Sequence, residues 1–242
     1  MAPPSRLGPA ALLALGAVLA GGLVGRGVER FRQEDRYVTV KGVSEREVRA
    51  DLALWPLQFS SAGNDLPLAQ ARLDRDAARI RAFLVEQGID TAATQLQAFR
   101  VTDREANPYQ SPGGGPRYII SQTLMVRSTD PDRVMAASQR VGALVDAGVV
   151  LSSGPEYGPG GPTFIFTGLN DIKPAMIAEA TARAREAAEQ FARDAGSRLG
   201  SIRQANQGIF VILARDQAPG VSEGNQLEKT VRVVATVEYF LR

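Results

Sequence analysis

The chain has 242 residues, of which 44% are hydrophobic, and its formal net charge is +2. This length allows one large domain or two small ones, and the near-neutral charge does not indicate a nucleic-acid partner. The chain contains no cysteine and no histidine, which excludes disulfides, Ser-His-Asp hydrolases, and zinc or iron sites that need those ligands. An enzyme of this composition would depend on carboxylates, lysine, tyrosine or an all-oxygen metal site.

A targeting segment occupies residues 1–35. Residues 7–25 are apolar and uncharged and lie between Arg6 and Arg26. They are long enough for a helix that crosses a bilayer, which needs about 17–25 residues. One interpretation is a signal peptide cleaved after residues 18–20, and the other is an uncleaved anchor. Because the apolar run continues past that cleavage site, we expect a hydrophobic N-terminal helix that anchors the chain in a membrane.

The stretch of residues 36–60 organises the rest of the chain. It predicts two strands, at residues 37–43 and 48–60, with a charged turn at residues 44–47 between them. In the second strand apolar side chains occur on both sides of the alternation, which indicates that both of its faces are covered. Trp55 is expected in the core.

Three helices are predicted, over residues 67–87, 130–147 and 174–199, and each has one apolar stripe at helical spacing. Small residues predominate in the third stripe, so the third helix is expected to pack closely against its neighbours. The three stripes are Leu73, Ala77, Ile80 and Leu84; Val134, Ala137, Val141 and Leu144; and Met176, Ala180, Ala184, Ala187, Phe191 and Ala195. The ion pairs expected on the solvated side of the third helix are Glu179–Arg183 and Glu189–Arg193.

Strands and helices alternate along the rest of the chain. This order predicts an α+β fold, with three helices layered on a mainly antiparallel sheet. Because no long linker interrupts residues 36–242, we expect a single domain there. The further strands are predicted at residues 96–103, 118–127, 149–153, 163–167, 209–214 and 230–241, and polar loops at residues 104–116, 156–162 and 215–225.

Three groups of motifs resemble the SIMPL-domain family, in which a glycine-containing strand and an acidic turn lead into an Asp-x-Ala strand. The resemblance covers nearly all of residues 36–242. The residues that carry it are Thr39-Val40-Lys41-Gly42 with Glu45, Glu47, Val48, Asp51 and Ala53; Ala180-x-x-x-Ala184-Arg185-x-Ala187 with Gly196 and Leu199-Gly200; and the strand at residues 231–240.

The resemblance implies a bacterial envelope protein that is linked to oxidative-stress tolerance and is not an enzyme. Some relatives form large ring-like or barrel-like homo-oligomers. The family has no established catalytic residues to transfer, so we assign no catalytic, cofactor-binding or metal-binding residue and expect no cofactor. The partners expected are further copies of this chain, through sheet edges and the three loops, and a membrane, through residues 7–25.

The orientation in the membrane is indicated in two opposite ways. Arginines at positions 26, 30, 32 and 36 follow the apolar segment, and the positive-inside rule would then keep the domain in the cytoplasm. The family resemblance implies export. We expect the chain in the bacterial inner membrane with its domain in the periplasm, or, if residues 1–20 are cleaved, free in the periplasm.

Two glycine-rich runs invite comparison with phosphate-binding loops. Residues 113–115 lead through Pro116 and Arg117 into a predicted strand, without the lysine and Ser/Thr before a helix that a P-loop needs. Residues 158–161 have the same defect. Both are interpreted as ordinary loops.

The best carboxylate cluster consists of Glu45, Glu47 and Asp51. With another acid such as Asp103 it could bind a divalent cation and perform acid–base chemistry, but a solvated turn with internal ion pairs explains it more simply. Lys41 could act as a base only if it were desolvated. The alternatives to an assembly protein are therefore a carboxylate-dependent metalloenzyme and a ligand-binding envelope module with a sizeable apolar pocket.

Two tyrosines lie in the predicted proline- and glycine-rich loops. These are Tyr109 and Tyr157. Exposed aromatic side chains in loops are suited to contacts with a partner or a second subunit. We therefore keep both as candidate contact residues.

Overall fold

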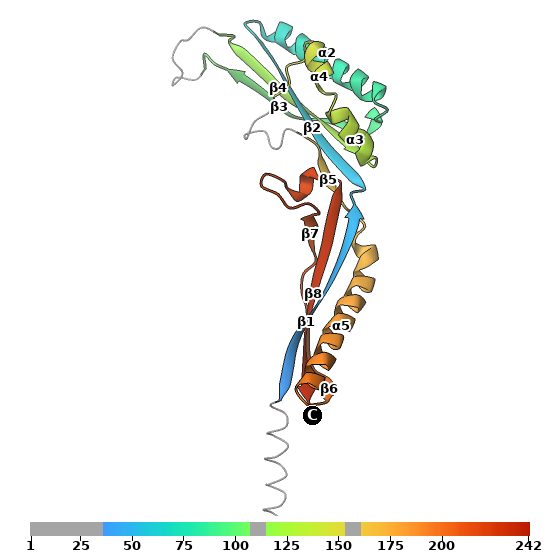
Figure 1. Ribbon diagram of the computed structural model, residues 1–242. Helices are drawn as coiled ribbons and strands as arrows, with labels where there is room; N and C mark the ends of the chain where they lie inside the picture. Colours follow the sequence, from blue (N-terminus) through green and yellow to red (C-terminus); the bar gives the residue numbers. More distant parts are fainter. Residues whose placement is uncertain (1–35, 107–114, 153–160) are drawn as a thin grey trace, which may run out of the picture. The chain divides into compact units, whose positions relative to one another are not determined.

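The computed structural model describes residues 36–106, 115–152 and 161–242, which fold as α+β (Figure 1). The chain divides into two compact units. Unit 1 takes its described residues from Met1–Glu45, Lys173–Val211 and Arg232–Arg242, and unit 2 consists of Arg46–Ile172 and Ile212–Val231. The predicted N-terminal helix lies outside the described residues. Within them, no helix is both long and apolar enough to cross a bilayer.

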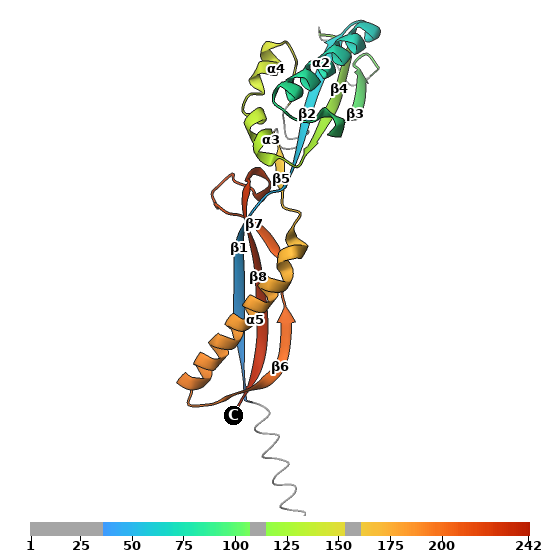
Figure 2. The ribbon, with the colours of Figure 1, turned by 90° about the vertical axis from the view of Figure 1, so that its right-hand side faces the viewer.

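Unit 2 contains an antiparallel sheet in the order β3–β4–β2–β5. Three helices lie on one face of this sheet, as Figures 1 and 2 show. The strands are β2 (Leu52–Gly63), β3 (Thr94–Asp103), β4 (Tyr118–Ser128) and β5 (Thr163–Ile165). The helices are α2 (Leu66–Glu86), α3 (Pro131–Ser138) and α4 (Gly142–Asp146).

The core of unit 2 lies between the helices and one face of the sheet. Trp55 is 1% exposed, as predicted, and its partner across the sheet, Val126, is fully buried. The alternate side chains of β2, such as Leu54 and Gln58, are only half-buried. Both faces of β2 were expected to be covered. The face toward the helices is fully covered, and the opposite face is only partly covered. The buried residues of α2 include all four of its predicted stripe, Leu73, Ala77, Ile80 and Leu84.

Helix boundaries follow from capping. The side chain of Asp65 accepts a hydrogen bond from the backbone N–H of Leu68 (2.9 Å), which satisfies a free donor of the first turn of α2. The predicted second helix is two helices, because the backbone around residues 140–144 bonds three residues back instead of four; the Ala143 N–H, for example, bonds to the Arg140 carbonyl. Gly142, a poor helix former, lies at this break.

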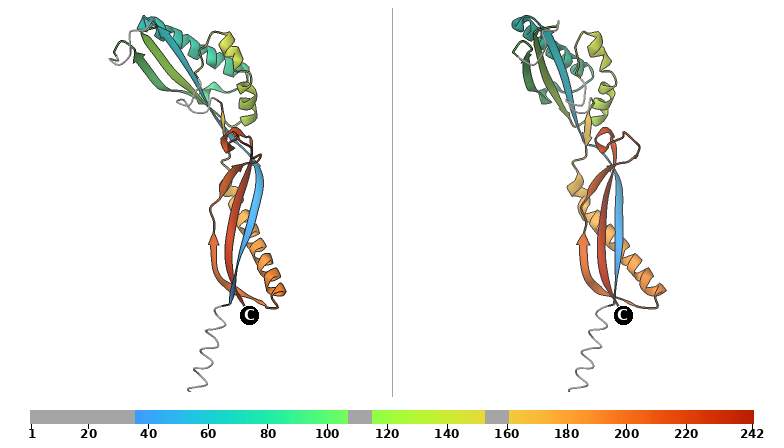
Figure 3. Two further views of the ribbon diagram at one scale, coloured as in Figure 1. Left: turned by 60° about the vertical axis from the view of Figure 1, so that its left-hand side comes forward. Right: turned by 90° about the vertical axis from the view of Figure 1, so that its left-hand side faces the viewer.

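The sheet of unit 1 has the order β1–β8–β6, with β7 also pairing with β8 (Figure 3). The elements are β1 (Tyr37–Arg49), α5 (Leu169–Asp194), β6 (Leu199–Gln207), β7 (Val211–Ala214) and β8 (Glu228–Leu241). Most of β7 and one end each of β1, α5 and β8 belong to unit 2. Helix α5 lies along one face, where Ala184 and Ala188 form a core cluster with Val38, Val237 and Tyr239. The predicted close packing of this helix is confirmed.

The predicted turn at residues 44–47 is wrong, because β1 continues through it to Arg49. Its polar side chains have partners within unit 1: the buried Ser44 hydroxyl donates to a carboxylate oxygen of Glu179 (2.9 Å), and Glu45 pairs with Arg232 on β8 (3.1 Å). Polar groups paired in this way lie stably in a sheet. The break between β1 and β2 falls at residues 50–51.

The predicted stripe of α5 is correct up to Ala184 and wrong beyond it. The buried residues continue at four-residue steps to Ala188 and Ala192, whereas Ala187 is exposed and Phe191 is 50% exposed. The Glu179–Arg183 ion pair is confirmed at 2.6 Å. Glu189 pairs with Arg185 (3.0 Å) and not with Arg193, whose guanidinium bonds to Gln190.

The predicted strands at residues 96–103, 118–127, 163–167 and 230–241 are present with small shifts at their ends. The structure differs from the predictions at one predicted strand and at one strand that was not predicted. Of the strand predicted at residues 149–153, the described part, residues 149–152, contributes an isolated bridge between Leu151 and Phe59. Strand β6 was missed, because its polar, exposed residues lack an apolar alternation.

Candidate interaction surface

Strand β3 is the outermost strand of the unit 2 sheet and pairs with β4 alone among the described residues. Every residue from 95 to 102 is exposed. Three of them are large and apolar: Leu96, Phe99 and Val101 are 42%, 53% and 43% exposed. An edge strand also presents unpaired backbone N–H and C=O groups. Strand β3 is therefore an open edge that carries apolar side chains.

The apolar residues of β3 extend the core face of the sheet. Leu96 pairs with Leu124, and Val101 pairs with Ile120; both partners are completely buried. Directly paired residues point to the same side of a sheet. Ala98, with φ of +52°, lies in a bulge where the register with β4 shifts. The bulge divides β3 into two short regular arms.

The C-terminal end of β3 is held by an ion pair with Arg117, the residue that directly precedes β4. Asp103 accepts from Nε (3.1 Å) and Nη2 (3.0 Å) of Arg117, whose Nη1 also pairs with Glu105 (2.9 Å). The hydrogen bonds from Arg117 hold the pKa of Asp103 below its ordinary value. Because the charge of Asp103 is matched within its own chain, the edge presents a nearly neutral surface.

Unit 1 has an exposed edge of its own in β6. All residues from 201 to 207 are exposed, including Ile202 at 52%. Ile202 pairs with Tyr239 of β8, which is buried under α5, so Ile202 extends the core face of that sheet. Each unit therefore ends on an exposed strand with an apolar side chain next to its core.

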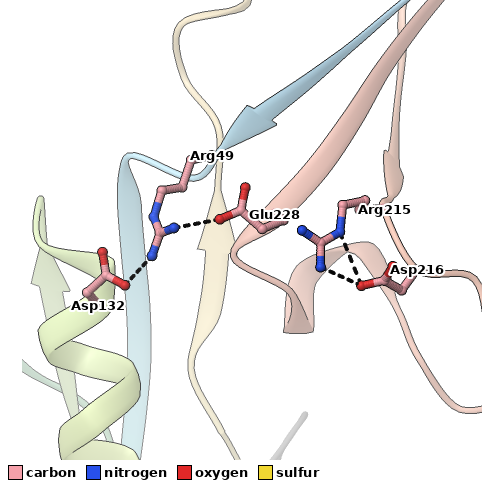
Figure 4. A network of polar contacts seen from close by, with 5 residues as sticks. All are labelled: Arg49, Asp132, Arg215, Asp216 and Glu228. Atoms are coloured by element: carbon pink, nitrogen blue, oxygen red, sulfur yellow. Dashed lines mark hydrogen bonds and ion pairs between the residues drawn. The ribbon is translucent and has the colours of Figure 1, made fainter.

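Two groups of ion pairs in unit 2 are centred on Arg49 and on Arg215 (Figure 4). The guanidinium of Arg49 bonds to Asp132 of α3 and to Glu228 of β8 (2.5 Å). These bonds, that to Asp132 above all, raise the pKa of Arg49. Arg215 pairs in the same way with its neighbour Asp216 (2.8 Å), and it lowers the pKa of that carboxyl. Arg49 therefore joins two carboxylates, whereas Arg215 and Asp216 form a single pair.

The loop at residues 215–225 is anchored by a buried lysine. Lys229 is completely buried, and its Nζ donates to the backbone carbonyl of Glu223 (2.6 Å) and to the carboxylate of the same residue. A buried ammonium is stable only when paired in this way. Sequence alone offers one signal for it: Lys229 is in phase with Val231 and Val233, which also face inward on β8.

The candidate carboxylates do not form a cluster, and Glu45, Asp51 and Asp103 each have a different partner. Glu45 pairs with Arg232, as described above, and Asp51 accepts hydrogen bonds from the N–H (2.9 Å) and hydroxyl (3.0 Å) of Thr167. Asp103 is bound to Arg117, and Glu47 is exposed on β1. Over the ranges that the structure describes, no three acidic residues are grouped so that they could hold a metal ion.

The other candidates are placed as follows. Lys41 is exposed and thus not desolvated, which removes the premise for a reactive amine there. Tyr109, Tyr157 and most of the two glycine runs lie outside the described residues. Arg49 was missed, because nothing near it in the sequence shows that it meets α3.

A comparison with models of protein families identifies the family of this chain. A model of the SIMPL family, described as a protein of unknown function (DUF541), matches residues 38–239. The chain belongs to the SIMPL family. The match includes residues of both units, from β1 through β8, and confirms the resemblance drawn from the glycine strand and the alanine-rich helix. The chain has no match among the curated proteins.

Proposed function

We propose that this SIMPL protein is a non-enzymatic envelope protein that assembles into homo-oligomers through β3. The observation that carries the proposal is the exposure of Leu96, Phe99 and Val101 on an edge strand that pairs only with β4 among the described residues. Apolar side chains beside free backbone groups favour a contact with another strand, because one contact removes both from water. The partner that fits is a second copy of this chain.

The residue order of β3 is self-complementary in an antiparallel pair. In the register that places Leu96 opposite Val101 of a second copy, Thr94 lies opposite Asp103 and Gln97 opposite Arg100. Apolar residues then meet apolar residues, and no two like charges are opposed, a condition that stabilises cross-strand pairs. The same contact repeated by a two-fold axis closes into a dimer.

A second contact would extend such dimers. Strand β6 of unit 1 is exposed over residues 201–207 and is independent of β3 in sequence. Two separate self-contacts on one chain generate larger closed assemblies or rings. This is consistent with the ring-like homo-oligomers that the family resemblance implies. That resemblance also supports a link to oxidative-stress tolerance.

The measurement is the mass of the full-length protein in an uncharged detergent, by light scattering after size-exclusion chromatography. We expect a multiple of the 25.9 kDa chain mass. The double substitution Phe99→Glu and Val101→Glu places carboxylates on the edge and is expected to lower the mass at least two-fold.

Val85→Glu is the matched control, since Val85 is a 60% exposed apolar residue on α2 of the same unit. It should leave the mass unchanged. A single-chain mass for the wild type at high micromolar concentration would refute the proposal. An equal effect of the control would refute the role of β3.

We further propose that residues 7–25 anchor the assembly in the bacterial inner membrane, with both units in the periplasm. The length and apolar character of that segment support the anchor, and the family resemblance supports export. Protease added to intact spheroplasts is expected to digest the membrane-bound chain. Protection of the chain until the cells are lysed would place it in the cytoplasm, as the flanking arginines favour.

A further inference from the structure

A groove of about 390 Å³ lies in unit 2, between α2, the end of β2 and residues 148–150. This volume is in the range of small-molecule sites, about 300–1,000 Å³. Its walls contain both polar and apolar surface, and most of their charged groups are basic. Three arginines of α2 line it, Arg72, Arg75 and Arg79, together with Ser60 and Ser61 of β2, whose side chains point to opposite faces of the sheet. The excess of arginine makes this groove suited to an anionic ligand.

The three arginines lie on one side of α2 because their spacing is three and then four residues. They extend over about 10 Å along the helix axis, at about 1.5 Å per residue. All three side chains are exposed, next to the buried stripe that faces the sheet. The helix therefore presents a row of guanidinium groups along the groove.

The groove holds more positive than negative charge. Its single carboxylate, Asp76, is 7% exposed and pairs with Arg79 (2.9 Å). Arg75 donates only to the carbonyl of Ala71 in its own helix (3.2 Å). Neither Arg72 nor Arg75 has an ion pair with a carboxylate among the residues that the structure describes. The lining thus carries three positive charges against one negative charge.

This arrangement leaves a repulsion that a dianion would relieve. Like charges three or four positions apart on a helix destabilise it. A guanidinium presents a planar fork of N–H donors that fits two oxygens of a phosphate group. Two guanidiniums without a carboxylate partner among the described residues match the charge of one phosphate dianion, and their N–H groups match its oxygen acceptors.

We propose that this groove binds a phosphate monoester as its dianion, with Arg72 and Arg75 as the main contacts. Arg79, held by Asp76, borders the site. The ester can be a soluble small molecule or the headgroup of a lipid, since both present the same terminal phosphate. The inference does not depend on the proposed assembly through β3, which involves other residues.

The test is isothermal titration calorimetry of the full-length protein in uncharged detergent, with glycerol 3-phosphate at constant ionic strength. We expect saturable binding of one equivalent. Arg72→Gln and Arg75→Gln should each weaken binding about ten-fold, and the double variant should abolish it. Binding should also weaken from pH 7.5 to pH 5, since the second pKa of a phosphate monoester is about 6.

Arg81→Gln is the matched control, because Arg81 is on the same helix but does not line the groove. It should bind as the wild type does. Circular dichroism checks that the glutamine variants fold, and we expect no loss of thermal stability, since each removes a repelling charge. Light scattering should give the same mass for the glutamine variants as for the wild type. A loss of binding at unchanged mass would then concern the groove and not the assembly through β3.

Vesicles with phosphatidic acid, compared with vesicles of phosphatidylcholine alone, identify the source of the phosphate. Binding only to the phosphatidic acid vesicles, lost in the double variant and kept in Arg81→Gln, would assign the site to a lipid headgroup. The absence of saturable binding to either probe would overturn the proposal. An equal loss in Arg81→Gln would also overturn it, because the attraction would then be non-specific.

Discussion

Gly42 marks the closest approach between β1 and α5 in unit 1. A Cβ atom added at Gly42 would lie 3.0 Å from the carbonyl carbon of Ala180, and closer still to the Ala180 oxygen and the Ala184 nitrogen. Ordinary contacts of a Cβ begin at about 3.4 Å. The atoms in the way belong to the helix backbone, so no rotamer change can relieve the clash. Gly42→Ala must push α5 away from the strand.

The expected loss in the free energy of unfolding follows from the contacts that this movement of α5 breaks. Ala180, Ala184 and Ala188 are completely buried, and a displaced helix loses contacts along this whole row. Overpacking of a tight core costs about 1–3 kcal/mol and occasionally more. Because the obstacle here is backbone, we expect about 3 kcal/mol. For a chain of this size that corresponds to a Tm lower by about 6–12 °C.

The assay is thermal unfolding followed by circular dichroism, which reports the total helicity of the chain; α5, with 26 residues, is the longest of the described helices. The fluorescence of Trp55, the only tryptophan, reports unit 2 separately. Gly142→Ala is the control: nothing lies within 4 Å of a Cβ there, so we expect equal or slightly higher stability. Ala180→Gly should not rescue Gly42→Ala, because it removes none of the blocking backbone atoms. A Tm for Gly42→Ala within about 1 °C of the wild type would refute the reasoning.

Two further predictions concern charge and packing. The hydrogen bonds from Arg117 lower the pKa of Asp103. The pair therefore stabilises the fold at pH values above the ordinary aspartate pKa of about 4. This stabilisation is lost as the pH falls through the pKa that Asp103 has in the folded state. Asp103→Asn should therefore lower the Tm at pH 7 and make little difference at about pH 2, and an equal difference at both pH values would contradict this. Ala188→Leu, at a completely buried position, should destabilise by about 1–3 kcal/mol or more, whereas Ala187→Leu, at an exposed position, should be tolerated. Urea unfolding distinguishes the two variants. Equal midpoints of unfolding would contradict the burial of Ala188 and the exposure of Ala187.

The successful predictions depended on local patterns with a single physical meaning. Leu73 and Ile80 repeat at helical spacing next to the capping residue Asp65, and the structure buries both. In α5 the same reasoning failed after Ala184, because steps of three and of four residues both keep to one helix face in a run of alanines. Packing against Val237 and Tyr239 selects the four-residue step to Ala188.

The candidate carboxylates show that the local sequence does not predict long-range partners. Glu45 and Asp51 are close in sequence and form a plausible cluster, yet their partners, Arg232 and Thr167, are more than a hundred residues away. Nothing in the local pattern predicts such partners. The groove lined by Arg72 and Arg75 was missed for the same reason, since on a helix alone those arginines are ordinary solvated residues.

By itself, the sequence determined the SIMPL family, the α+β class, the apolar N-terminal segment, and the exclusion of chemistry that needs cysteine or histidine. These follow from composition and from periodicities that one strand or one helix imposes. Only the tertiary structure decided that β1 continues through its charged residues, that β3 is an open apolar edge, and that the arginines of α2 face a groove. Each of these depends on which distant segment lies alongside, because pairing partners and burial are properties of the packed chain and not of its local pattern.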